Sequence, residues 1–227
     1  MAQNDLHTEA IVLRRTKYGE TDRILNLITP TGKLSVIAKG ARKEKSKLAG
    51  GIEMFCVSEI TVHYKNNHSS GLGILTSAKL KIFYSNILNS LEKLELASDI
   101  IKKISKLSEH IDSPELYTLT KSCFSAIHQT ENQRLIEAWA LLNLARISGD
   151  QINLHFDING KPLSANQNYN WDTLERTLAP HDSGKITADH IKFLRLILST
   201  DLPTVLRVQN TNDLLDDILY IAKSCYN

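Results

Sequence analysis

The 227 residues of this chain are enough for one large domain or two small ones, and their composition is that of a globular protein rather than a disordered one. The longest apolar runs are too short to cross a bilayer, and the N-terminal residues lack the basic start and apolar segment of a signal peptide. With only three scattered cysteines, the sequence predicts a protein of the reducing cytoplasm.

The net charge of +2 conceals an uneven distribution along the chain. Residues 1–80 carry 12 Lys or Arg against 7 Asp or Glu, whereas residues 81–227 carry 15 against 18. A basic first part followed by an acidic second part predicts two domains, residues 1–80 and 81–227. Any binding of an anionic partner is expected in the first of them.

Five short strands are expected in the first 80 residues, because β-branched and alternating apolar residues are separated by turn residues. The strands span about residues 8–15, 23–29, 34–39, 55–64 and 72–78. Five short strands joined by tight turns suit a small β-barrel. The oligonucleotide-binding (OB) fold is the first choice for such a barrel, and an SH3-like barrel is the structural alternative.

From Ile82 onward the apolar residues recur at a helical period, which predicts a change of fold class. Ser113 and Pro114 have the residue types that begin a helix. A further helix is expected over about residues 132–147, and Gly149 is a natural stop for it.

Residues 150–183 are mostly polar, with a turn expected at Asn159 and Gly160. Thr187 can cap a following helix, and a last amphipathic helix is expected over about residues 212–223. The fold class is therefore α+β: a five-stranded barrel followed by a mainly helical domain.

The densest positive charge lies in a loop after the third expected strand. Residues 39–47 hold five basic residues and one acid, Glu44. The loop leaves a barrel strand, where OB folds place their binding loops, and glycines 40, 50 and 51 allow close backbone approach. We therefore expect a phosphate-binding surface rather than a merely solvated loop. The predicted contacts are Arg15, Lys17, Arg23, Lys39, Arg42, Lys43, Lys45 and Lys47.

Two tyrosines at strand ends, Tyr18 and Tyr64, are candidate platforms for base stacking, and a place in the core or at its rim is the alternative for each. Contacts led by charge carry no base information, so binding independent of sequence is expected. An RNA-binding module in translation or RNA processing is the alternative to a DNA-binding one. A clear preference for RNA over single-stranded DNA would distinguish them.

Catalysis and metal binding have weaker support. The sequence contains no phosphate-loop, dinucleotide-loop, nucleophile-elbow or zinc-protease motif. His63 alternates with apolar neighbours and is expected to point outward, so a hydrolase using His63 or His68 is a distant alternative. Cys56, Cys123 and Cys225 are too widely spaced for a zinc site, and the first two are expected in the core. We therefore expect no enzyme, no cofactor and no metal.

A series of short motifs is common to this sequence and a known family. Residues 10–13, 18–24, 29–33 and 38–42 read AIVL, YGETDRI, TPTGK and AKGAR, followed by SKL at 46–48, Gly50 and GLGILT at 71–76. In order and spacing the series resembles the N-terminal signature of the RecO family of bacterial recombination mediators. The resemblance is specific over residues 8–80 and looser beyond them.

The resemblance implies an OB fold followed by a helical domain, and a non-enzymatic role in DNA repair and recombination in the bacterial cytoplasm, associated with the nucleoid. It implies binding of single- and double-stranded DNA, annealing of complementary strands and, with RecR, help for RecA in replacing the single-strand-binding protein SSB. The helical domain is expected to receive the acidic, Phe-ended tail of SSB. Glu20 and Asp22 match the family pattern, and we expect them to form or cap a turn because acids repel phosphate.

Two features depart from the family pattern. Many members carry a four-cysteine zinc site after the third helix, whereas residues 150–171 contain no cysteine here. A zinc requirement is therefore not expected, and the turn at residues 159–162 is expected to close this segment instead. The end of the chain is acidic at Asp213, Asp216 and Asp217, which argues against DNA contact by the last helix.

Overall fold

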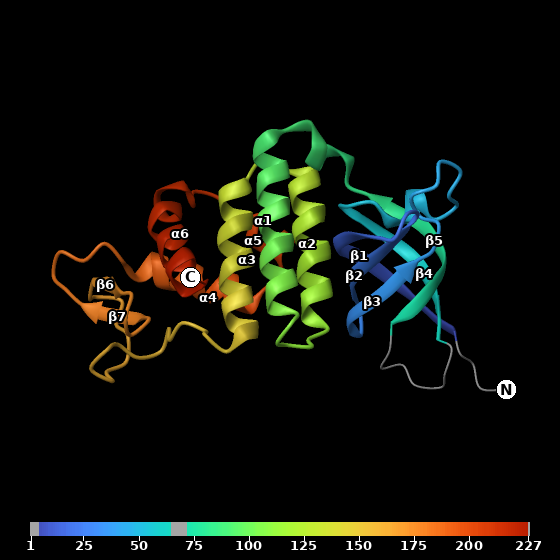
Figure 1. Ribbon diagram of the computed structural model, residues 1–227. Helices are drawn as coiled ribbons and strands as arrows, with labels where there is room; N and C mark the ends of the chain where they lie inside the picture. The colour runs from blue at the N-terminus through green and yellow to red at the C-terminus, as the bar shows by residue number, and fades with distance from the viewer. Residues whose placement is uncertain (1–4, 65–71, 227) are drawn as a thin grey trace. The chain divides into compact units, whose positions relative to one another are not determined.

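The computed structural model describes residues 5–64 and 72–226 of the chain (Figure 1). These residues form two compact units, which divide between Gln129 and Thr130. Both units bury apolar side chains.

The first unit begins with a β-barrel of five strands (Figure 1). They are β1 (Asp5–Tyr18), β2 (Asp22–Thr29), β3 (Gly32–Ala38), β4 (Cys56–His63) and β5 (Gly73–Phe83). β1 pairs antiparallel with β2 and with β4, and β3 pairs parallel with β5, so the strand order is β1-β2-β3-β5-β4. This is the order of the OB fold. The predicted five-stranded barrel is therefore confirmed, and the order excludes the SH3-like alternative.

The barrel core is built from alternate residues of the strands, as the period of two requires. Val12 lies opposite Leu27, and Leu25 lies opposite Val36, and all four side chains are buried in one cluster. Two strands are longer than expected. β1 spans Asp5–Tyr18 where residues 8–15 were expected, and β5 continues to Phe83 where an end near residue 78 was expected. Ile82 lies in β5 opposite Val57, so the prediction of a helical period from Ile82 is wrong.

Two helices complete the first unit, α1 (Leu91–Leu107) and α2 (Glu115–Gln129), after a short 3-10 turn, η2 (Ser85–Asn89). Phe124 of α2 packs edge-on against Phe55 and Tyr84, with ring centroids 5.6 and 5.7 Å away. The helices therefore bury one side of the barrel within a single unit. β5 also runs through residues 80 and 81. The domain limits 1–80 and 81–227 stay a prediction.

The second unit is helical with one small sheet (Figure 1). Its elements are α3 (Gln133–Ser148), β6 (Tyr169–Asp172), β7 (Thr177–Pro180), α4 (Ala188–Ser199), α5 (Leu202–Val205) and α6 (Asn212–Tyr226). Gly149 ends α3 in the left-handed conformation at φ 89°, and Thr187 caps α4, as predicted. The β6–β7 hairpin was not predicted, because strands of four residues give little alternation to detect.

Candidate nucleic-acid interface

The β1–β2 hairpin continues beyond the barrel core and carries basic side chains there. On the inward face of the hairpin, Leu25 of β2 is the core residue nearest to the turn, and it lies opposite Arg15 of β1. The next pair toward the turn on the same face is Lys17 with Arg23. Paired residues on adjacent strands share a face, so the row that is apolar inside the barrel becomes cationic where the barrel ends. The hairpin turns at Gly19, whose φ of 55° suits a residue without a side chain.

The basic loop, residues 39–48, is a chain of tight turns rather than an open coil. The backbone N–H groups of Lys43, Ser46 and Ala49 each donate to the carbonyl three residues earlier, at 3.1, 3.0 and 3.3 Å. The loop ends in the 3-10 turn η1 (Ala49–Ile52), which lies so close to β5 that a Cβ on Gly51 would be 2.3 Å from the Ala78 carbonyl oxygen. Successive turns project the basic side chains into solvent, and all five are exposed.

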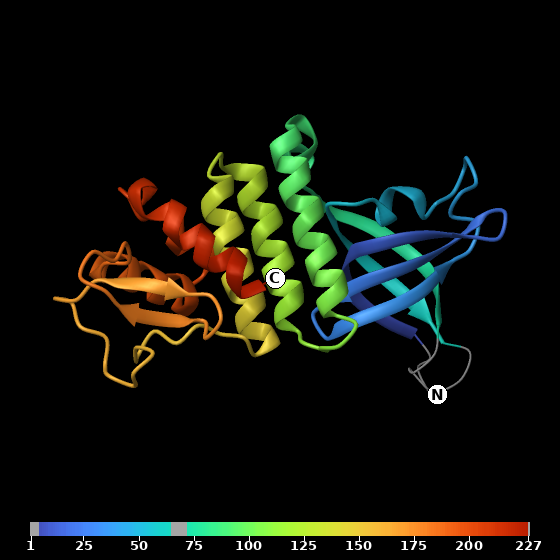
Figure 2. The ribbon, with the colours of Figure 1, turned by 60° about the vertical axis from the view of Figure 1, so that its left-hand side comes forward.

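The basic loop is joined to the β1–β2 turn by three hydrogen bonds. The Gly40 N–H donates to Asp22 Oδ1 at 2.7 Å, and the Arg42 N–H donates to the Thr21 carbonyl at 2.8 Å. The Arg42 guanidinium also donates to the Gly19 carbonyl at 3.3 Å. Figure 2 shows the turn and the loop at the same end of the barrel.

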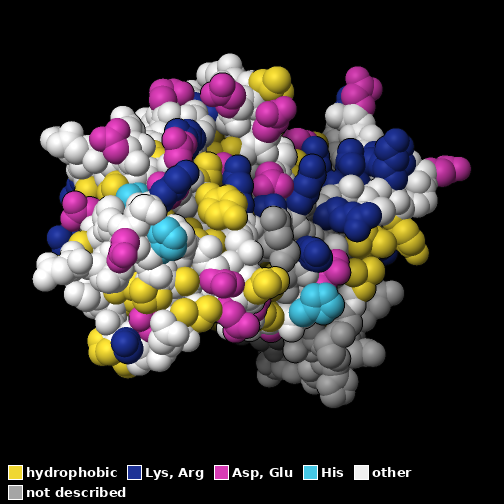
Figure 3. Space-filling view, turned by 90° about the vertical axis from the view of Figure 1, so that its left-hand side faces the viewer, with side chains coloured by type: hydrophobic (Ala, Val, Ile, Leu, Met, Phe, Trp, Pro, Cys, Tyr) yellow, Lys and Arg dark blue, Asp and Glu magenta, His cyan; other side chains and the backbone are white. Residues whose placement is uncertain are grey.

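These bonds bring together seven of the eight predicted contact residues. We call this group the cationic surface: Lys17, Arg23, Lys39, Arg42, Lys43, Lys45 and Lys47. Within the part of the chain that the structure describes, none of the seven has an acidic side chain within 4.0 Å. Figure 3 shows a group of neighbouring Lys and Arg side chains on its right-hand side. Such a surface attracts a polyanion and releases its counterions on contact.

Arg15, the eighth predicted contact, differs from the other seven. Its guanidinium donates to Glu53 at 2.7 Å, and its side chain is only 25% exposed. The Glu53 carboxylate therefore offsets the charge of Arg15, and a phosphate would have to compete with it.

The two acids of the β1–β2 turn have different surroundings. Asp22 accepts hydrogen bonds from the Gly40 N–H and from the Thr21 hydroxyl, and its side chain is the acceptor that the sequence predicted. The Gly40 bond, followed by the Thr21 bond and the nearby charges of Lys39 and Lys43, lowers the pKa of Asp22. Glu20 is exposed, and its carboxylate has no hydrogen bond or ion pair with any residue that the structure describes.

The two tyrosines proposed as stacking platforms have separate outcomes. Tyr18, at the end of β1, is 51% exposed beside the cationic surface, so its ring is accessible. Tyr64 is 9% exposed and belongs to the barrel core cluster, so for this tyrosine the alternative of a place in the core is correct. Tyr64 lies two residues after the buried Val62, so its side chain points to the same side and is buried in the same cluster.

The described candidates for catalysis or metal binding are His63, Cys56, Cys123 and Cys225. His63 points outward and lies 2.7 Å from Asp5, as an outward strand residue should, whereas His68 is outside the described residues. Cys56 and Cys123 are buried, which confirms their predicted place in the core, and Cys225 is buried in α6. Burial raises the pKa of the Cys56 thiol to about 11, so it is a poor nucleophile.

The segment after α3 does not fit a four-thiolate zinc site. Asp157 is buried there, and its Oδ1 accepts from the N–H groups of Asn159 and Lys161 at 2.8 and 2.9 Å. Gly160 closes the predicted turn by donating to the Asp157 carbonyl at 2.9 Å. Among the described residues, no three His, Cys, Asp or Glu side chains are grouped to hold a metal ion. Backbone N–H donors to the buried Asp157 carboxylate therefore hold this turn.

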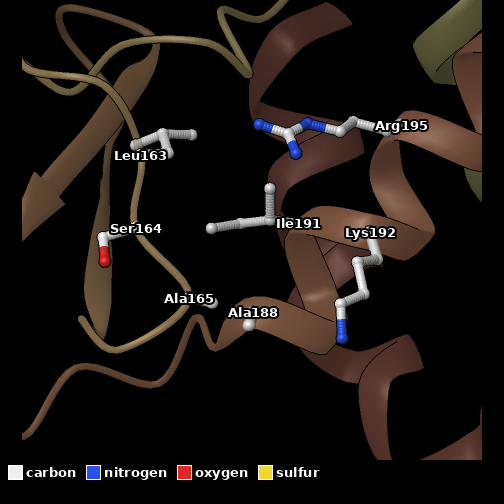
Figure 4. A pocket seen from close by; sticks show the side chains of 7 residues that line it. All are labelled: Leu163, Ser164, Ala165, Ala188, Ile191, Lys192 and Arg195. Atoms are coloured by element: carbon white, nitrogen blue, oxygen red, sulfur yellow. The ribbon is translucent and has the colours of Figure 1, made fainter.

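Two hollows flank α4 in the second unit, and sequence reasoning did not find them. The smaller, about 60 Å³, lies between α4 and residues 163–165, with Ile191, Lys192 and Arg195 on the helix side (Figure 4). The larger, about 540 Å³, has a mixed lining: its apolar part includes Phe193 and Val208, and Lys192 is among its polar residues. Lys192 and Arg195 are three residues apart and share one face of α4, and Ile191 lies four residues before Arg195; this basic pair beside an apolar residue was the available signal.

No helix in the described part of the chain is long and apolar enough to cross a membrane.

Comparison with known proteins covers nearly the whole chain. The family model for the recombination protein O N-terminal region matches residues 1–84, and that for its C-terminal region matches residues 88–227. A DNA repair protein RecO of Dehalococcoides mccartyi is 28% identical over 223 residues, which cover 95% of this chain and 87% of the relative. The RecO of Syntrophomonas wolfei is 25% identical over 225 residues, covering 96% and 88%. That of Thermoanaerobacter sp. is 35% identical over 133 residues, covering 58% and 52%. The chain therefore belongs to the RecO family of DNA repair and recombination proteins.

Proposed function

We propose that this protein is a non-enzymatic recombination mediator that binds single- and double-stranded DNA through the cationic surface. The observation that carries the proposal is the joining of the basic loop to the β1–β2 turn, which gathers seven cations that have no acidic partner among the described residues. Phosphate contacts position a strand without reading its bases, so binding independent of sequence follows. Membership of the RecO family makes DNA the expected nucleic acid.

Annealing needs no nucleotide hydrolysis under this proposal. Two complementary strands repel each other through their phosphates, and a protein that neutralises some of these charges lowers the repulsion. Base pairing then supplies the free energy. Together with RecR, the protein would act where RecA must replace SSB on single-stranded DNA.

We infer that the acidic tail of SSB docks beside α4. Lys192 lines both hollows there, with an apolar lining on one side and Arg195 on the other. The larger hollow also contains Asp189 and Asp213, and Lys192 bonds to Asp189 at 3.0 Å. These two acids disfavour tail carboxylates in that hollow. The apolar end of the tail therefore fits the larger hollow, and its acids fit the side of Lys192 and Arg195.

Strand annealing on bare and on SSB-coated DNA tests both parts of the proposal. Arg42→Glu with Lys43→Glu should slow annealing on both substrates, because it removes the phosphate contacts. Lys192→Glu should slow annealing only on SSB-coated DNA, since it removes the docking cation and leaves the cationic surface intact. Energy transfer between labelled complementary strands gives the rates, and Lys185→Glu, another exposed lysine of the second unit, is the control.

Two results would count against the DNA-binding proposal, one from the basic-loop variant and one from competition by RNA. Annealing of bare DNA by the Arg42→Glu, Lys43→Glu variant at the wild-type rate would contradict the DNA-binding proposal. Stronger competition by RNA than by single-stranded DNA of the same sequence would favour the RNA-binding alternative.

A further inference from the structure

An acidic side chain lies inside the cationic surface, where simple electrostatics would not favour it. Asp22 ends the β1–β2 turn and is flanked in space by Lys39 and Lys43, whose charges act on its carboxylate. A carboxylate at this point repels phosphate and lowers the net charge of the surface. On charge alone, its removal should strengthen DNA binding.

The contacts of Asp22 indicate the opposite effect. Its Oδ1 accepts from the Gly40 N–H at 2.7 Å, which is short and therefore strong for an N–H bond to a carboxylate. The same oxygen accepts from the Thr21 hydroxyl at 3.1 Å, which fixes the orientation of the carboxylate. Gly40 is the first turn residue after Lys39, at φ 62°, a conformation that a glycine adopts without strain.

Gly40 begins the series of turns that forms the basic loop, so its bond to Asp22 orients the first of these turns. The Gly40 carbonyl accepts from the Lys43 N–H, and the Lys43 carbonyl accepts from the Ser46 N–H. The direction of the first turn therefore sets the direction of the next ones. The other end of the loop is fixed separately, where Gly51 lies against β5.

We propose that Asp22 is a positioning residue for DNA: its hydrogen bond to Gly40 holds the basic loop beside the β1–β2 turn, so that the cations of both segments contact one strand. This inference rests on the proposed function. Asp22 does not touch the DNA in this account. It lowers the entropy cost of binding, because the loop is already ordered before the phosphates arrive.

The test compares three variants of the full-length chain for binding to single-stranded DNA. Asp22→Ala adds one positive net charge but loses the acceptor, Asp22→Asn makes the same charge change and keeps an acceptor oxygen, and Glu20→Ala removes an exposed acid of the same turn. Asp22→Ala should bind on the order of tenfold more weakly at 0.1 M salt. Its salt slope should be about 1.4 units shallower, which corresponds to about two lost phosphate contacts on a single strand.

The other two variants separate positioning from charge. Asp22→Asn should bind at least as tightly as the wild type, because the amide oxygen still accepts from Gly40. Glu20→Ala should do the same, since only a repulsive charge is lost. Amide hydrogen exchange gives a second readout: the Gly40 N–H should lose protection in Asp22→Ala and keep most of it in Asp22→Asn. Circular dichroism checks that each variant is folded. Should Asp22→Ala unfold, Asp22→Ser replaces it, because its shorter hydroxyl does not span the distance to Gly40.

Three results would overturn the inference. Binding by Asp22→Ala that is as tight as that of Glu20→Ala would show that only charge matters at this turn. Equal weakening in Asp22→Asn would show that the hydrogen bond is not the cause. An unchanged exchange rate at Gly40 would show that the loop is held by other contacts. In each case a weakened Arg42→Glu, Lys43→Glu variant would leave the proposed function standing, whereas a wild type that fails to bind DNA would remove that function itself.

Discussion

Glu9 of β1 has partners on two other elements of the first unit. Its carboxylate accepts from Lys81 of β5 at 2.5 Å, from Lys121 of α2 at 3.1 Å and from the hydroxyl of Tyr117, also in α2. This one side chain of β1 thus links β1 to β5 and links the barrel to α2. Sequence reasoning did not find it, because its partners are far along the chain and Glu9 alone reads as an ordinary strand acid.

The stability of the first unit should depend on the charge of Glu9. The hydrogen bonds from Lys81 and Tyr117 lower its pKa from 4.5 to about 2. A lowered pKa stabilises the fold fully above pH 4.5, and the contribution is lost as the pH falls toward 2. Glu9→Gln should therefore lower the unfolding free energy at pH 6 and make it less dependent on pH between 4.5 and 2.

Urea unfolding of both proteins across this pH range gives the measurement. Glu59→Gln is the control, since Glu59 is an exposed partner of Lys81 at 3.4 Å and has no contact with α2 among those described. If the unfolding free energy fell equally between pH 4.5 and 2 in Glu9→Gln and in the wild type, the role given to Glu9 would be contradicted.

At the scale of elements, turn chemistry was predicted from residue types, but the side chains that anchor the turns were not. Gly149 and Gly160 lie in left-handed conformations at the helix stop and the turn that the sequence predicted, and Gly40 is left-handed as well. Their partners are Asp22 for Gly40 and Asp157 for the turn that contains Gly160. Asp157 was not singled out because an acid three residues before a glycine is common in surface loops. Its burial decides its role, and burial depends on the tertiary fold.

The turn anchored by Asp157 should hold residues 150–187 without a metal. Asp157→Ala leaves the N–H groups of Asn159 and Lys161 without their acceptor, and such a loss costs about 1–3 kcal/mol. Thermal or urea unfolding should show this decrease, and Asp182→Ala, which removes an exposed acid, should not. Addition of a strong chelator to the wild type should leave the unfolding midpoint unchanged, and a lower midpoint would contradict the metal-free account.

At the scale of the whole molecule, the sequence predicted the barrel, whereas the domain limits 1–80 and 81–227 stay a prediction. Turn residues and alternating apolar residues located all five strands, and the basic loop was found from its charge alone. The place where the chain divides into compact units, between Gln129 and Thr130, was not anticipated. The reason is physical. A helical period predicts a helix but not the element against which its apolar face packs. Here α2 packs on the barrel side of the first unit through Phe124.

The central claim is that the cationic surface binds the phosphates of DNA, and the salt dependence of binding tests it most directly. The logarithm of the binding constant for a single-stranded oligonucleotide should fall linearly with the logarithm of salt concentration for the wild type. Arg42→Glu with Lys43→Glu should make this slope shallower by about 1.4 units, since two phosphate contacts are lost. Lys102→Glu with Lys185→Glu changes the net charge equally at exposed residues outside the cationic surface, and it should keep the wild-type slope. A slope that is unchanged in the Arg42, Lys43 variant, or equally shallow in both variants, would contradict the account.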